Sequence, residues 1–250
     1  MTETATVAID PHVHSEGSYD GREPVELLLE HASEIDLDGV VVTDHDTIEQ
    51  SLRATELAPE YGLLGIPGVE VSTRDGHLLA IGVETCPERG RPLAETVEWV
   101  REAGGVAIVP HPFQRSRHGV KKRNLTDCDA IEVYNSMVFT GYRNRRAKAF
   151  ASAHEYPEVG ASDAHYLPNV GRAYTEIHID LDAASLHPER IDGRAVVEAI
   201  RTGATEIRGK RTPIHRSVRQ YTMGALRKAA YLTTYWMPFV PTVPSSMSDS

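Results

Sequence analysis

Histidines and acidic residues lie together at several separate places in this chain, in combinations that suit metal binding. The segments that carry them are Asp10-Pro11-His12-Val13-His14, Asp44-His45-Asp46, Glu70, His77, His111-Pro112 and Asp163-Ala164-His165. Imidazole nitrogens and carboxylate oxygens suit zinc, iron and manganese, and none of these segments offers a thiolate. The pattern therefore predicts a hydrolytic metal centre in preference to a structural zinc site.

The spacing inside two of these segments supports the same interpretation. His12 and His14 are two residues apart, so at the end of an extended strand both rings point to the same face. Asp163 and His165 repeat that spacing near the other end of the chain. A single His-x-His pair is weak evidence, because such pairs are common at strand ends. The combination of both pairs with Glu70 and the other histidines is what indicates a shared site.

Short runs rich in β-branched residues recur along the chain, and segments with helical periodicity separate most of them. We expect strands at residues 5–9, 39–43, 63–71, 78–83, 106–109, 130–134, 158–161 and 171–180. We expect helices at residues 24–35, from 46 onward, and at 91–103, 143–154 and 193–202. This alternation predicts a mainly parallel sheet, with one hairpin at Arg74-Asp75-Gly76.

The metal-type residues fall at or just after the ends of most of these expected strands. A parallel barrel gathers side chains from many strand ends around one mouth, whereas an open sheet concentrates them at a single crevice. The sequence therefore favours a small α/β barrel. We expect the barrel domain to cover residues 1–205 and a basic, aromatic extension to cover residues 206–250, with a disordered end at 245–250.

Composition limits the classes of function. The chain has 250 residues and a formal net charge of −10, which argues against a surface devoted to nucleic acid. Cys86 and Cys128 are far apart and outside any C-x-x-C spacing, so we expect no disulfide and a reducing, cytoplasmic location. The first residues lack the basic and apolar regions of a signal peptide, and no apolar stretch approaches the length of a membrane span.

The basic extension has two interpretations. Residues 208–228 carry seven Lys or Arg and no acidic residue. Residues 223–237 are somewhat like an interfacial amphipathic helix, which would suit a membrane or a protein partner. We favour the alternative of a C-terminal helix that packs on the acidic barrel of its own chain.

The ordered motifs resemble the PHP family, named for polymerase and histidinol phosphatase, over roughly residues 5–180. The segments that carry the resemblance are Asp10-Pro-His-Val-His14, Asp20-Gly21, Thr43-Asp-His-Asp-Thr47, Gly68-Val-Glu-Val-Ser72, His77-Leu-Leu-Ala-Ile-Gly82, His111-Pro-Phe113 and Ser162-Asp-Ala-His165. The resemblance implies a distorted seven-stranded (β/α)7 barrel with two or three divalent metal ions, manganese, zinc or iron, at its mouth.

The resemblance also implies the metal ligands. They form three groups: His12, His14, Glu70 and Asp163 for one ion; Glu70, His77 and His111 for a second; and Asp20, His45 and His165 for a third. Glu16 lies in the same loop as Asp20 and is the alternative ligand there. We expect Asp10 and Asp44 to orient imidazoles, and Asp46 to cap a helix.

Several cations at one mouth would lower the pKa of a bound water and neutralise phosphate oxygens. We therefore expect a metal-bridging hydroxide to attack a phosphate ester in line, with Glu70, His111, Asp163 and His165 as the catalytic residues. His165, a metal ion or a water chain would assist the leaving alkoxide.

Basic residues near the expected mouth are candidates for binding substrate phosphate. Arg115 and Arg117 lie in the segment 114–123, which contains five basic residues and no acidic one, and Arg172 follows the last expected ligand by seven residues. A solvated basic loop is an equally good interpretation of 114–123.

The leading hypothesis is a hydrolase of phosphoric ester bonds that acts on a small phosphorylated metabolite or nucleotide. The residues leave three alternatives open. Two are enzymatic: a histidinol-phosphate phosphatase, and a nuclease-type enzyme that processes oligonucleotide ends. The third is a membrane-binding or partner-binding module whose metal ions are structural.

Overall fold

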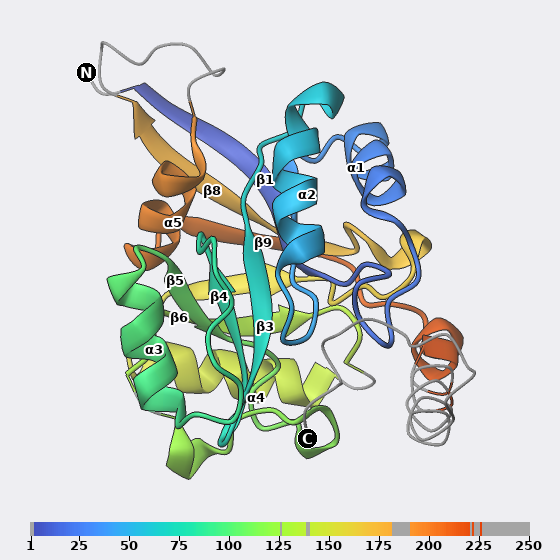
Figure 1. Cartoon of the computed structure of the whole chain (residues 1–250). Helices are drawn as coiled ribbons and strands as arrows, with labels where there is room; N and C mark the ends of the chain where they lie inside the picture. Colours follow the sequence, from blue (N-terminus) through green and yellow to red (C-terminus); the bar gives the residue numbers. More distant parts are fainter. Residues whose placement is uncertain are drawn as a thin grey trace.

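A computed structural model describes residues 3–125, 127–138, 141–181 and 191–220, together with residues 222 and 226. The chain forms an α/β fold with two β-sheets (Figure 1). The four-stranded sheet has the order β2 (Gly39–Val42), β1 (Glu3–Val13), β8 (Ala173–Leu181), β9 (Thr205–Gly209). The five-stranded sheet runs in sequence order through β3 (Gly68–Thr73), β4 (Gly76–Ile81), β5 (Val106–Val109), β6 (Ala130–Asn135) and β7 (Glu158–Ala161).

The strands are of mixed direction, so the predicted parallel sheet is only partly correct. The pairs β1–β2, β5–β6 and β6–β7 are parallel, whereas β1–β8, β8–β9, β3–β4 and β4–β5 are antiparallel. The hairpin predicted at Arg74-Asp75-Gly76 is confirmed, since Thr73 pairs with Gly76 across the turn. Residues 162–172 join β7 to β8 without a long helix, and parallel strands usually need such a crossover.

Among the described residues, continuous strand pairing does not close the expected seven-stranded barrel. Their strands divide into two sheets that touch through isolated bridges, Val13 with Ala164 and His45 with Glu70. Apolar runs in a sequence indicate burial but not which strands share a hydrogen-bonded ladder, and this explains the difference. Both bridges lie beside candidate metal ligands, so the two sheets meet where the predicted site is.

Helices cover the outer faces of the sheets. The first pair is α1 (Val25–Glu34) and α2 (Glu49–Leu57), and α1 buries Val25, Leu28, Leu29 and Ala32 against β1 and β2, as its periodicity predicts. Helices α3 (Leu93–Glu102) and α4 (Gly141–Ala153) pack on the five-stranded sheet (Figure 1). Helix α5 (Gly193–Arg201) packs against the apolar core shared by the two sheets. Short 3-10 helices lie at Ala58–Tyr61, Arg115–Arg117, Lys122–Asn124 and Leu167–Asn169.

The predicted helix cap at Asp46 is wrong. The residue that precedes α2 is Ile48, and it makes no side-chain capping bond. Asp46 instead adopts a left-handed backbone conformation with φ of 54°, and its Oδ1 accepts a hydrogen bond of 2.6 Å from the backbone N of Ser72. Asp46 therefore fastens the loop after β2 to β3.

The part of the chain beyond α5 is attached to the body. Strand β9 lies across residue 206, where the sequence suggested that an extension starts, and it pairs with β8 along its whole length. Residues 214–220 are helical. Of the predicted amphipathic segment 223–237, all residues except Leu226 lie outside the described part of the structure. Among the described residues, no helix combines the length and the apolar character needed to cross a bilayer.

Candidate metal centre

The nine residues that the sequence singles out as ligands lie together where the two sheets meet. We call them the ligand cluster: His12, His14, Asp20, His45, Glu70, His77, His111, Asp163 and His165. All are buried except Asp20, which is half-buried. Most follow the carboxyl end of a strand, and His77 is consistent with this because β4 runs antiparallel to β3, which brings its amino end to the same edge.

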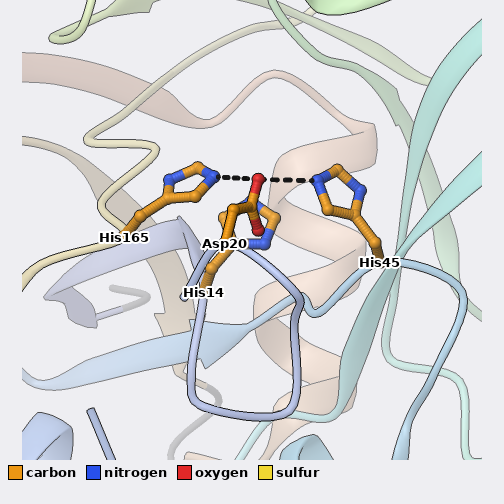
Figure 2. A group of neighbouring side chains, drawn as sticks. All are labelled: His14, Asp20, His45 and His165. Atoms are coloured by element: carbon orange, nitrogen blue, oxygen red, sulfur yellow. Dashed lines mark hydrogen bonds and ion pairs between the residues drawn. The ribbon is translucent and has the colours of Figure 1, made fainter. Parts of the chain in front are cut away.

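The cluster divides into four overlapping groups whose potential ligand atoms lie within 4.8 Å of one another. The groups are His14, Asp20, His45 and His165 (Figure 2); His12, His111 and Asp163; His12, His14 and Glu70; and His45, Glu70 and His77. This partition differs from the expected one. His14 also joins the Asp20 group, His45 also joins Glu70 and His77, and His111 and Asp163 form a group with His12. Shared residues make the groups one continuous site.

The carboxylate of Glu70 occupies the middle of the cluster. It contacts five imidazoles. Oε1 lies 2.9 Å from His77 Nδ1 and 3.1 Å from His111 Nε2. Oε2 lies 3.2 Å from His45 Nδ1, 3.3 Å from His14 Nε2 and 3.5 Å from His12 Nε2. Its neighbours Val69 and Val71 are buried in the apolar core on the other face of β3. Strand alternation therefore delivers one carboxylate to the polar side and two valines to the core.

Asp20 reaches the cluster from the loop between β1 and α1. Its Oδ2 lies 3.0 Å from His165 Nε2 and 3.5 Å from His45 Nε2, between the two rings (Figure 2). The loop passes so close to the backbone that a Cβ on Gly21 would lie 1.8 Å from the carbonyl oxygen of Ser15. Glu16, the alternative ligand in this loop, is exposed.

Comparisons with known proteins show what this fold is similar to. A family model described as PHP-associated matches residues 141–205. The structure is similar to that of a two-domain protein from Bacteroides vulgatus described as containing a predicted PHP-like metal-dependent phosphoesterase, with a TM-score of 0.61 at 19% identity, over 87% of this chain and 70% of the other. The chain therefore has the fold of a PHP-like protein.

Curated proteins are also similar to this chain in sequence. An uncharacterized protein of Methanocaldococcus jannaschii is 28% identical over 149 residues, which is 55% of this chain and 87% of the relative. The phosphoribosyl 1,2-cyclic phosphate 1,2-diphosphodiesterase of Eggerthella lenta is 37% identical over 81 residues, 30% of each chain. The second relative is named for action on a cyclic phosphate.

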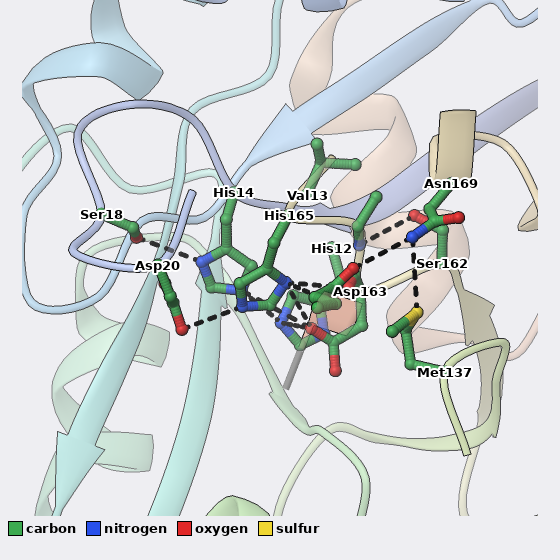
Figure 3. Close-up of polar contacts among 12 residues, drawn as sticks. His12, Val13, His14, Ser18, Asp20, Met137, Ser162, Asp163, His165 and Asn169 are labelled. Atoms are coloured by element: carbon green, nitrogen blue, oxygen red, sulfur yellow. Dashed lines mark hydrogen bonds and ion pairs between the residues drawn. The ribbon is translucent and has the colours of Figure 1, made fainter. Parts of the chain in front are cut away.

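A buried glutamate that the sequence analysis missed contacts two residues of the ligand cluster. Oε1 of Glu132 lies 3.0 Å from Nδ1 of His12, and Oε2 accepts hydrogen bonds from the backbone N of His111 at 2.6 Å and from Asn135 Nδ2 at 2.9 Å. The available signal was one acidic residue inside the apolar run of residues 130–134. Ser18 contacts another ligand histidine in the same way, since its Oγ lies 3.2 Å from His14 Nδ1 (Figure 3).

Asp10 and Asp44 were expected to orient imidazoles, but their carboxylates accept hydrogen bonds from backbone N–H groups. Asp10 accepts hydrogen bonds from the backbone N of Ser162 at 3.0 Å and of Gly171 at 2.9 Å. Asp44 accepts one of 2.8 Å from the backbone N of Ser15. These carboxylates therefore fix the loops that carry the cluster, and burial raises the pKa of Asp10 to about 6.

Burial and neighbouring charges shift the pKa values of the side chains in the ligand cluster. Burial disfavours the charged form of His12 and His45, yet the surrounding carboxylates raise the pKa of His12 well above its usual value and that of His45 to about 9. Burial lowers the pKa of His14 to about 3, helped by the neighbouring His165. Burial opposes ionisation of Glu70 too, but the facing histidines, His77 first, hold its pKa well below the usual range.

Several features show that a divalent ion fits this donor set. Nε2 of His12 and Nε2 of His14 lie 3.1 Å apart and face each other, an arrangement that a shared cation stabilises. Within the described residues, Asp20 Oδ1 and His111 Nδ1 are buried without a hydrogen-bond partner. His111 and Asp163 adopt positive φ angles of 30° and 54°, and backbone strain of this kind concentrates at functional sites.

The three arginines expected to bind substrate lie in different surroundings. Arg117 contacts the ligand cluster directly, because its Nη1 forms an ion pair with Asp163 Oδ2. Arg115 is exposed and lines a separate pocket of about 440 Å³ formed with other basic residues of the 114–123 loop. Arg172 donates a hydrogen bond of 2.9 Å from Nη2 to the carbonyl oxygen of Arg211. Arg172 therefore contacts the C-terminal segment.

Proposed function

We propose that this chain is a PHP-type metal-dependent phosphoesterase that hydrolyses a small phosphorylated metabolite or nucleotide. The observation that carries the proposal is the contact of one buried carboxylate, Glu70, with five imidazoles at the meeting point of the two sheets. Such a concentration of histidines around a buried acid suits several divalent cations in close proximity. The similarity of the fold to that of a predicted PHP-like metal-dependent phosphoesterase supports the same class of reaction.

The residues present would hold two or three ions, with Glu70 shared between neighbouring positions. When bound, manganese, zinc or iron would supply Lewis acidity to a phosphate and lower the pKa of a water molecule. The ligand cluster offers no cysteine, so the centre is built from nitrogen and oxygen donors alone.

The remaining steps belong to the side chains around the cluster. Arg117, held at Asp163, is placed to bind a phosphate oxygen that approaches the cluster. Asp20 and His165 border a pocket on one side of the cluster, so we assign the leaving group to that side. Water beside His165 would return the proton that the departing alkoxide needs.

The test is phosphate release by the full chain after loading with manganese, zinc or iron. We expect turnover of one or more phosphomonoesters, and a loss of about a hundredfold or more in Glu70→Gln, which keeps the shape of the side chain but removes its charge. Full activity in Glu70→Gln at equal metal loading would contradict the proposal.

A cyclic phosphodiester belongs in the same panel because of the similarity to the Eggerthella lenta enzyme, which covers 30% of this chain. L-histidinol phosphate and a short single-stranded oligonucleotide test the two other enzymatic alternatives. The formal charge of −10 disfavours the oligonucleotide, and any binding of it should weaken steeply with salt.

A further inference from the structure

A pocket of about 240 Å³ opens directly beside the ligand cluster, between three segments that are far apart in the sequence. Asp20 and His165 of the cluster form part of its wall. Arg22 comes from the same loop as Asp20, and Arg216 and Arg219 come from the helical residues 214–220. The basic C-terminal segment therefore contributes a wall next to the candidate metal centre.

Three arginines, Arg22, Arg216 and Arg219, give the pocket wall positive charge. Arg216 donates one hydrogen bond of 3.1 Å from Nη1 to the carbonyl oxygen of Pro168, and the Arg219 guanidinium lies 5.2 Å from the centre of the Tyr166 ring. Within the described part of the chain, neither these two arginines nor Arg22 forms an ion pair with a carboxylate. A guanidinium in such a position suits a phosphate or carboxylate ligand.

The C-terminal wall of the pocket is fixed at two points. At its start, the backbone N of Thr212 donates to the carbonyl oxygen of Ser136 at 2.8 Å, and the hydroxyls of the two residues lie 2.8 Å apart. At its end, Gln220 Nε2 donates to the carbonyl oxygen of Asp163 at 3.1 Å, and Gln220 Oε1 accepts from Asn169 Nδ2 at 3.0 Å. The wall is thus tied to the loop that carries Asp163, which favours binding because little ordering is required.

We infer that this pocket receives the part of the substrate beyond the scissile phosphate, and that Arg22, Arg216 and Arg219 bind a second anionic group there. The inference rests on the proposed function and deepens it by naming a substrate class, a small phosphate ester with a carboxylate or a second phosphate at its far end. A volume of about 240 Å³ suits such a metabolite, since pockets for drug-sized ligands occupy roughly 300–1,000 Å³.

The experiment compares matched substrates on the metal-loaded full chain. One pair is 3-phosphoglycerate against glycerol 3-phosphate, which tests a carboxylate, and the other is fructose 1,6-bisphosphate against fructose 6-phosphate, which tests a second phosphate. We expect kcat/KM to favour the doubly anionic member of at least one pair by about tenfold or more. The pair that shows the preference identifies the anionic group.

The variants Arg216→Gln and Arg219→Gln should reduce that preference towards about one, because kcat/KM falls more for the doubly anionic member of the pair than for the singly anionic member. Arg219→Lys should retain part of the preference, because the charge remains. Arg194→Gln removes an exposed arginine of α5 and should leave the preference intact. A preference that is absent in the unaltered chain, or unchanged in both pocket variants, overturns the inference.

Direct binding separates this inference from the proposed function. Calorimetric titration of each compound into the same proteins should show about tenfold weaker binding of the doubly anionic compound in the pocket variants. Arginine-dependent binding without turnover of any phosphate ester would contradict the phosphoesterase and keep the anion site. Turnover with arginine-independent binding would keep the phosphoesterase and contradict the anion site.

Discussion

Nδ1 of His12 lies 3.0 Å from Oε1 of Glu132, and both side chains are almost completely excluded from solvent. A carboxylate on the outer nitrogen of a ligand histidine fixes the ring and leaves Nε2 free for a metal ion. The second oxygen of the same carboxylate accepts a hydrogen bond from the backbone N of His111. One glutamate therefore positions two members of the ligand cluster.

Glu132→Gln should weaken metal binding by about 10- to 100-fold, because the amide cannot supply the charge that favours the correct form of His12. Competition with a chromophoric chelator on the full chain measures this. Glu198→Gln is the matched control, since Glu198 forms an exposed ion pair with Arg201 on α5. Equal metal affinity in the two variants would show that Glu132 has no role in positioning the ligands.

Metal loading should release protons at neutral pH. Neighbouring carboxylates raise the pKa of His45 to about 9, so this ring carries a proton in the metal-free chain at pH 7, and nearby carboxylates also raise the pKa values of His12 and His165. A metal ion needs the unprotonated nitrogen, and metal affinity should therefore rise as the pH increases from about 6 to about 9. His14, with a pKa lowered to about 3, is neutral throughout this range and contributes no proton.

The measurement for proton release is calorimetric titration of the metal-free chain with zinc at pH 7, in two buffers that differ in ionisation enthalpy. The heats should differ by an amount that corresponds to at least about one proton per loaded chain. Identical heats in the two buffers would be incompatible with protonated ligands.

Arg117 leads to a prediction about substrate binding. Its guanidinium is paired with Asp163 and lowers the pKa of that carboxyl below its usual value. Arg117→Gln should raise KM for a phosphomonoester by about tenfold, through the loss of a charge-assisted hydrogen bond to phosphate. Steady-state kinetics with metal content measured in parallel checks this, and an unchanged KM at full metal loading would remove Arg117 from the substrate site.

The two cysteines should be slow to react in the folded chain. Burial raises the pKa of both Cys86 and Cys128 to about 12, so at pH 8 only about one thiol in ten thousand is ionised. Labelling with a chromogenic disulfide should be slow in the native chain and rapid in denaturant. Rapid labelling of both thiols without unfolding would contradict the burial seen in the structure.

Local patterns in the sequence were sufficient for individual elements. The helical spacing of Val25, Leu28, Leu29 and Ala32 predicts the buried face of α1, and the structure buries all four. The turn residues Arg74-Asp75-Gly76 predict the β3–β4 hairpin for a local reason as well, since a short turn leaves the chain only an antiparallel return. Both features depend on residues that are near one another in the chain.

Long-range relationships were harder to predict. The residues of β8 indicate a strand, but they do not indicate its partner, which is β1, more than 160 residues away. Glu132 is a lone acidic residue in its strand, and its role depends on His12, which is 120 residues distant. The attachment of Gln220 beside Asp163 has no local signal at all. The motifs nevertheless predict that the ligands lie in one region, because most of them follow the carboxyl end of a strand.

The central claim is that the ligand cluster binds divalent ions through the shared carboxylate of Glu70, and the most direct test is the metal content of the full chain. The chain should be loaded with manganese or zinc, dialysed and examined by mass spectrometry beside Glu70→Gln. The account predicts two or three ions per unaltered chain, from the overlapping groups around Glu70, and at least one fewer in the variant. A metal content at background in the unaltered chain, or the same content in both proteins, would contradict it.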